Sequence, residues 1–108
     1  MNNELPPENL ITEICELPTG QFRLLLVRYV ASLTIAARMH FADKEYESAQ
    51  SCNETLHKIL GFLADDLALG RMGNRRSMTE LVVTGAGHHN RLSMVKKALS
   101  GVRSPDNT

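Results

Sequence analysis

The chain has 108 residues, 43% of them hydrophobic and 22% charged, and its 12 basic and 12 acidic side chains leave no formal net charge. This composition excludes an intrinsically disordered protein, and the length suits one domain spanning residues 1–108. Aromatic residues make up only 5% of the chain. That scarcity favours packed helices over a sheet, where aromatic and β-branched side chains are enriched. We therefore expect an all-α fold.

The N-terminal stretch MNNELPPE predicts a cytoplasmic protein, because acids and prolines stand where a secretory signal has a basic and then an apolar segment. No uninterrupted apolar run approaches the ~20 residues of a membrane span, so we expect no membrane partner. Cys15 and Cys52 lack the spacing of metal ligands. We expect them to be small, partly buried hydrophobic side chains in a reducing compartment.

The charges are distributed unevenly along the chain. Residues 1–69 hold five basic and ten acidic side chains, whereas residues 70–108 hold seven basic and two acidic ones. Parts of opposite sign can attract each other within one chain or across a dimer, and a basic part can bind an acidic partner. The alternative is that the basic residues form a solvated face on an acidic bundle.

A short N-terminal helix is expected before a proline. Residues 1–8 are expected to be a mobile tail, Asn9 can cap the helix, and Pro18 ends it. One helical face carries the apolar residues Leu10, Ile11, Ile14 and Leu17.

A long helix is predicted over residues 20–41, with Thr19 as its cap. Its apolar stripe consists of Phe22, Leu25, Leu26, Tyr29, Val30, Leu33, Ala36 and Ala37. Leu24, Val27 and Ile35 widen the stripe, so we expect this helix to be buried on more than one side.

The stripe does not continue through the next segment, because the positions that would extend it are polar. An apolar face returns in a new phase with Tyr46, Ala49, Asn53, Leu56, Ile59, Leu60, Leu63 and Leu67. Asp43 is a preferred cap residue at the change of phase. We therefore predict that residues 20–41 and 44–69 form an antiparallel helical hairpin.

The C-terminal part is predicted to form two short helices. Residues 70–74 are a glycine-containing loop, and Ser77 with Glu80 fits a capping box that opens the first helix. Residues 84–87 break this helix, although residues 81–84 alone fit a strand. The last helix is expected over 88–100 with Gly101 as its stop, and residues 102–108 as a mobile tail.

His57 and Gly61 lie one turn apart, which is the spacing of a phosphoryl-accepting histidine with a small residue that clears space for a partner. The position before the glycine is Leu60, where such domains typically carry lysine. A glycine inside a helix costs about 1 kcal/mol relative to alanine, and close helix packing explains it as well as partner docking does. Phosphotransfer through His57 is therefore an alternative hypothesis.

A basic patch is the basis of a second alternative, a nucleic-acid-associated regulator. Its residues are Arg71, Arg75, Arg76, Arg91, Lys96 and Lys97. The basic part lacks aromatic residues for base stacking. His88 and His89 have no Cys, Asp or Glu at a ligand spacing, so loop chemistry accounts for them better than a metal.

The hairpin segment, residues 24–67, resembles the central part of the bacterial flagellar export chaperones, which hold newly made flagellin. The matching positions are Leu25, Leu26, Tyr29, Ala37, Asp43, Tyr46, Ala49, Leu56, Ile59, Leu60, Leu63 and Leu67. The chain after Gly70 departs from that family, which continues with further long helices. The resemblance implies a small helical chaperone or adaptor that holds an amphipathic segment of another protein.

The residues lead to a related expectation. A long helix that is apolar on more than one side needs more cover than short helices provide, so we expect a partner protein or a homodimer. The predicted function is a non-enzymatic protein–protein interaction module without catalytic residues, metal or cofactor.

Overall fold

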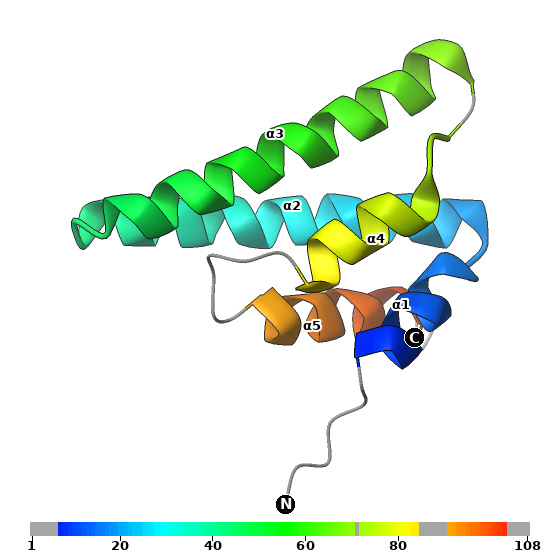
Figure 1. Ribbon diagram of the computed structural model, residues 1–108, viewed down its shortest axis with the longest axis horizontal. Coiled ribbons are helices and arrows are strands. Elements are labelled where there is room, and N and C mark those ends of the chain that lie inside the picture. The colour runs from blue at the N-terminus through cyan, green and yellow to red at the C-terminus, as the bar shows by residue number, and fades with distance from the viewer. Residues whose placement is uncertain (1–6, 71, 85–90, 104–108) are drawn as a thin grey trace, which may run out of the picture.

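The computed structural model describes residues 7–70, 72–84 and 91–103, and these ranges contain five α-helices and no strand (Figure 1). The helices are α1 (Pro7–Cys15), α2 (Thr19–Ala42), α3 (Tyr46–Leu69), α4 (Arg75–Thr84) and α5 (Arg91–Arg103). The all-α prediction is confirmed. The two long helices are 24 residues each and pack against each other as the predicted antiparallel pair.

The turn of the hairpin is closed by a Schellman motif and not by an aspartate cap. The backbone N–H of Glu45 donates to His40 O at 2.8 Å and that of Lys44 donates to Phe41 O at 3.0 Å. Lys44 has φ 63°, the left-handed conformation that glycine usually supplies at this position. Asp43 ends α2 and Glu45 precedes α3, so the prediction that Asp43 caps the second helix is wrong.

Other predicted helix starts are displaced by a few residues. Asn9 lies inside α1, and Thr19 is the first residue of α2, preceded by Pro18 with no side-chain cap. The capping box at residues 77–80 is wrong, because Asn74 precedes α4 and its Oδ1 accepts a bond from the N–H of Ser77 at 3.0 Å.

The predicted ends of the chain are also corrected. Pro7 and Glu8, expected in the N-terminal tail, belong to α1, and Gly101, expected to stop the last helix, lies within α5. Val102, expected in the C-terminal tail, is buried. The remaining predicted tail residues, 1–6 and 104–108, and the predicted break at residues 85–87 lie outside the described residues.

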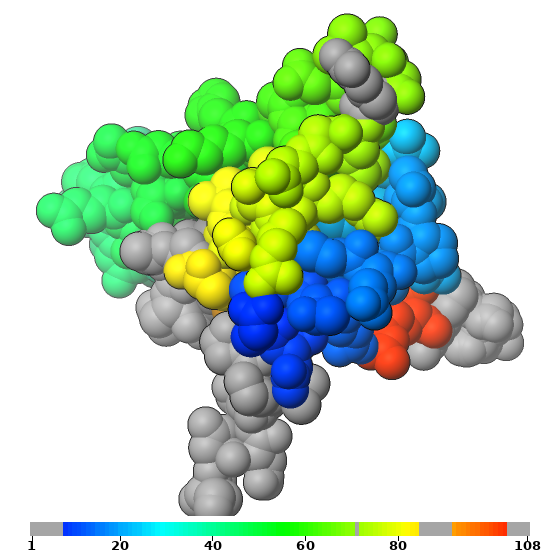
Figure 2. All heavy atoms as spheres, turned by 45° about the vertical axis from the view of Figure 1, so that its right-hand side comes forward, coloured from blue at the N-terminus to red at the C-terminus, as the bar shows by residue number. Residues whose placement is uncertain are grey.

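The hydrophobic core forms around α2. Six of its residues are buried and face the short helices and α3, namely Phe22, Leu25, Leu26, Tyr29, Leu33 and Ala37. The short helices and the turn after α1 add Leu10, Ile11, Ile14, Leu17, Met78, Val82, Val83, Val95, Ala98, Leu99 and Val102. Figure 2 shows how α4 packs beside α1 and below α3.

Among the described residues, α2 is long and apolar enough to cross a membrane, judged by length and composition alone. By these two criteria the expectation that no apolar segment approaches the length of a membrane span is wrong. The core helix of a soluble protein passes the same test. Six residues of α2 are buried in this fold and its opposite side is exposed, so the expected absence of a membrane partner stays a prediction.

Candidate protein-interaction face

The three short helices all lie on one side of the hairpin. In Figure 1, α4 passes in front of α2, while α1 and α5 lie below it. The Tyr29 hydroxyl of α2 donates to Val82 O of α4 at 3.5 Å, and Gly101 of α5 approaches the Arg28 guanidinium. The opposite side of α2 is exposed to solvent, which corrects the prediction that Leu24, Val27 and Ile35 are buried.

We call the uncovered side of the hairpin the bare face. It consists of Leu24, Val27, Ala31, Thr34 and Arg38 from α2 and of Asn53, His57, Leu60, Ala64 and Leu67 from α3, all exposed. Its large apolar side chains are 44% (Leu24), 53% (Val27), 48% (Leu60) and 87% (Leu67) exposed.

A groove places the two halves of the bare face on the same side of the hairpin. It has a volume of about 400 Å³ and is lined by Thr34, Ala37, Arg38, Phe41, Ala49, Asn53 and Leu56. Val27 lies seven residues before Thr34, and Leu60 lies seven residues after Asn53. Because residues seven apart are within about 20° of one another around a helix, Val27 and Leu60 continue the two walls of this groove.

An ion pair sets the register of the two long helices. Arg23 Nε lies 2.6 Å from Asp66 Oδ2, and the Arg23 Nη2 donates to Oδ1 at 3.1 Å. Asp66 is buried. The hydrogen bonds from Arg23 hold the pKa of the Asp66 carboxyl below its ordinary value, and burial opposes this shift.

The register divides the bare face into two ends. Pairing residue 23 with 66 brings Leu24 and Val27 level with Leu60 and Leu67, at the end away from the turn. The same pairing brings Arg38 level with Asn53, near the turn. The face is therefore apolar at its open end and polar at its turn end.

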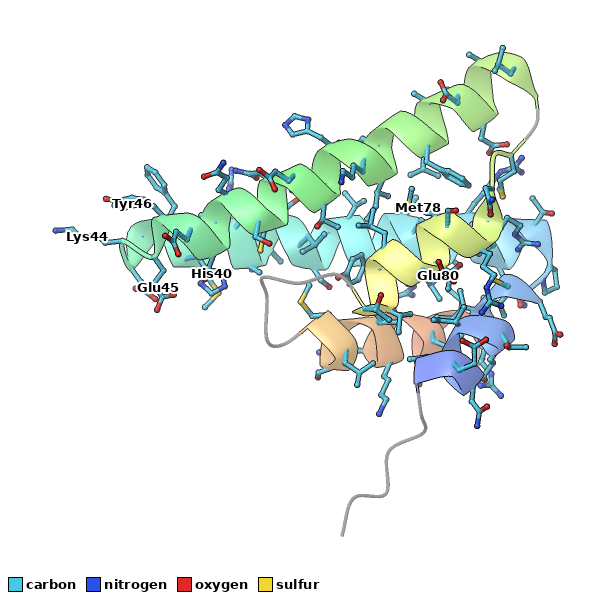
Figure 3. All side chains as sticks on the ribbon, viewed as in Figure 1. His40, Lys44, Glu45, Tyr46, Met78 and Glu80 are labelled. Carbon is cyan, nitrogen blue, oxygen red and sulfur yellow. The ribbon has the colours of Figure 1, made fainter. Side chains whose placement is uncertain are left out.

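Two exposed aromatic rings lie at the turn end. Phe41 and Tyr46 are 65% and 55% exposed, and their ring centroids are 5.4 Å apart in an edge-to-face arrangement. Both rings line a second groove of about 300 Å³, together with Ala49, Gln50, Asn53, Glu54 and His57. Figure 3 shows Tyr46 pointing away from the side that holds His40 and Glu45, whose Nδ1 and Oε1 are 2.6 Å apart.

His57 and Gly61 are both exposed on α3. A Cβ built on Gly61 meets no heavy atom within 4 Å, so close packing of described helices does not account for this glycine. The space above it is open to another molecule. Phosphotransfer through His57 stays a prediction.

Two of the four described side chains of the predicted basic patch are engaged within the molecule. Arg75 is partly buried, donates to Leu17 O at 2.6 Å and stacks on Phe22 with its guanidinium carbon 4.3 Å from the ring centroid. Arg76 forms ion pairs with Glu8 and Glu80.

Two other described side chains of the predicted basic patch lie on α5. Lys96 is partly buried and Lys97 is exposed on α5, while Arg71 and the side chain of Arg91 lie outside the described residues. His88 and His89 lie outside them as well. The nucleic-acid hypothesis stays a prediction.

The opposite charges of the two chain parts meet within the molecule. Arg76 of α4 pairs with Glu8 of α1, and Arg103 of α5 pairs with Glu13 of α1. The pKa of Arg76 is raised by Glu8 first and Glu80 second. These pairs support the prediction of attraction within one chain.

The described residues contain no group of three His, Cys, Asp or Glu side chains that can hold a metal ion. Cys15 is partly buried and Cys52 is buried, which agrees with the predicted small hydrophobic side chains, and the two form no disulfide. Comparison of the chain with protein-family models, curated proteins and solved structures finds no match. The bare face is therefore the feature from which a function can be inferred.

Proposed function

We propose that this protein is a non-enzymatic protein–protein interaction module, a small adaptor or chaperone that binds its partner through the bare face. The observation that carries the proposal is the exposure of four large apolar side chains, Leu24, Val27, Leu60 and Leu67, on one face of two neighbouring helices. An exposed apolar face is typical of interaction sites.

The free energy available from covering this surface is large enough to matter. The exposed portions of the four side chains together amount to more than two fully exposed side chains. Since burying one such side chain contributes roughly 2 kcal/mol, covering all four contributes about 5 kcal/mol. A partner that presents an amphipathic helix, or a second copy of the chain, provides the matching apolar stripe.

The resemblance of residues 24–67 to flagellar export chaperones supports the same type of activity. That family implies a cytoplasmic bacterial protein that holds an amphipathic segment of a client. The chain after Gly70 differs from the family, so no binding residue is carried over from it.

The test compares two double variants, of which the control removes at least as much exposed apolar surface as the bare-face variant. Val27→Gln/Leu60→Gln changes the bare face. Met39→Gln/Leu69→Gln removes side chains that are 62% and 61% exposed but do not belong to that face. We expect the first variant to lose the partner in affinity purification from the native cell and the second to keep it, with equal helicity by circular dichroism.

Two results would contradict the proposal. One is retention of the partner by the bare-face variant. The other is equal loss of the partner by both variants, which would point to general loss of solubility rather than to a defined surface.

Histidine phosphotransfer is the second candidate function, and the exposed imidazole of His57 one turn before the open Gly61 favours it. We expect acid-labile phosphoryl label to pass from a cognate histidine kinase to the wild type and not to His57→Gln. A wild-type chain that takes up no label rules this function out.

A further inference from the structure

We infer that the bare face is covered by a second copy of this chain, related by a two-fold axis parallel to the long helices. In this dimer α2 of each copy packs on α3 of the other, and both hairpin turns lie at the same end. The inference rests on the proposed function, because it names the partner that binds the bare face.

Charge is the first reason for a second copy. On the bare face α2 carries Arg38 and no acidic residue, whereas Glu54 is exposed on α3 next to Asn53 of that face. Packing α2 on the partner's α3 therefore sets basic residues against acidic ones. Packing α2 on α2 sets arginine-bearing helices against each other.

The apolar pattern along the face selects the same arrangement. With the turns at one end, Leu24 and Val27 meet the apolar positions around Leu60 and Leu67 of the partner copy, and Arg38 meets the region of Glu54. With the turns at opposite ends, Leu24 of one copy meets Arg38 of the other. Only the first arrangement joins the apolar ends of the two faces to each other and the polar ends to each other.

Small residues on the face allow the helices to approach. Ala31 of α2 and Ala64 of α3 are exposed among the larger side chains. Leucine and valine side chains of one copy can pack into the space above these positions in the other, as ridges pack into grooves.

The size of the face is compatible with a dimer. From residue 24 to residue 42 a helix extends about 27 Å, and two packed helices are about 20 Å across. Each copy therefore contributes roughly 500 Å², so about 1,000 Å² is buried in total. That area is at the lower limit of specific interfaces, and we expect a dimer that dissociates on dilution.

The experiment measures the mass of the full chain by sedimentation over a wide concentration range, together with charge-reversed variants. We expect Arg38→Glu to weaken dimerisation about tenfold, and Arg38→Glu/Glu54→Arg to restore it, because the pair is regained with its signs exchanged. Lys97→Glu is the matched control on α5 and should leave the dimer unchanged.

Disulfide trapping fixes the arrangement. In a chain with Cys15→Ser and Cys52→Ala, one population carries Val27→Cys and the other carries Leu60→Cys. We expect crosslinked dimers in the mixture and not in either population alone, because residue 27 of one copy faces residue 60 of the other. Crosslinking of a single population, or no crosslinking in the mixture, overturns the arrangement.

A single-copy mass at every concentration up to about 1 mM overturns the dimer, as does a single-copy chain that floats with phosphatidylcholine or phosphatidylglycerol vesicles. Neither result by itself overturns the proposed function. Loss of a different protein partner on Val27→Gln/Leu60→Gln would still support an interaction module, with another occupant on the bare face.

Discussion

Replacing Gly61 by alanine should stabilise the isolated chain. Gly61 lies in the middle of α3, where glycine costs about 1 kcal/mol relative to alanine, mainly because it has more conformational freedom in the unfolded chain. An added Cβ meets no atom within 4 Å, so no steric cost offsets this gain. We therefore expect the free energy of unfolding to rise by about 1 kcal/mol.

The effect is large enough to measure in a chain of this length. A gain of about 1 kcal/mol raises the melting temperature by roughly 4–8 °C in a domain of about 100 residues. Urea and thermal unfolding followed by circular dichroism, at a concentration low enough to keep single copies, measures both quantities.

A second glycine supplies the control. An added Cβ at Gly101 comes within 3.0 Å of the Arg28 guanidinium, which must move away, so Gly101→Ala should gain less than Gly61→Ala. A melting temperature that does not rise in Gly61→Ala would mean that something packs closely on α3 at this position in the single chain. The conclusion that α3 is uncovered at Gly61 would then be wrong.

Three further outcomes are expected. Asp66→Asn should lower the urea midpoint at neutral pH. Arg23 lowers the pKa of Asp66 in the folded chain. The contribution of the Asp66 carboxylate to stability is therefore present above its unfolded pKa of about 4 and is lost as pH falls through the folded pKa. The difference in urea midpoint between wild type and variant should shrink below about pH 4. Lys44→Gly should raise the free energy of unfolding by up to about 1 kcal/mol, measured by urea unfolding, because φ is 63° there, and Lys44→Ala should not. Arg75→Ala should cost about 1–2 kcal/mol in the same assay through loss of its bond to Leu17 O, and Arg75→Lys should recover only part of it.

The hairpin was predictable because its signal is periodic. The apolar stripe of α2 and that of α3 are out of phase, and a helix cannot continue through a change of phase, so the turn falls near residue 43. The details of the turn were not predictable in the same way. A Schellman motif usually has glycine at the left-handed position, and here Lys44 occupies that position. The sequence therefore offers only Asp43, a preferred cap residue, as an indication of the turn.

The candidate site was only half predictable. The excess apolar width of α2 is visible in the sequence, but the side on which the short helices pack depends on tertiary contacts such as Tyr29 with Val82. The burial of Asp66 depends on the register of the hairpin, which brings Arg23 opposite it. Sequence spacing within one helix contains neither piece of information, because both pairs join residues more than 40 positions apart.

The bare face follows from the lengths of the elements. The hairpin offers two faces about 36 Å long, since each helix has 24 residues that rise about 1.5 Å each. The described short helices have 9, 10 and 13 residues, and they meet one another as well as the hairpin. The loop after Gly70 is short and returns α4 to the side that holds Phe22 and Tyr29, where α1 and α5 also lie.

The bare face carries apolar residues of the kind that helices bury, and no described element of the chain covers them. A surface that contacts only solvent does not require Leu24, Val27, Leu60 and Leu67 on one face. Polar residues with good helix propensity would stabilise α2 and α3 equally well at these positions. Replacing all four by glutamine should therefore leave the melting temperature of the single chain nearly unchanged, since their exposed atoms contribute little to its core. If that variant instead unfolds, these side chains belong to the fold of the single copy, and the bare face is not an interaction surface.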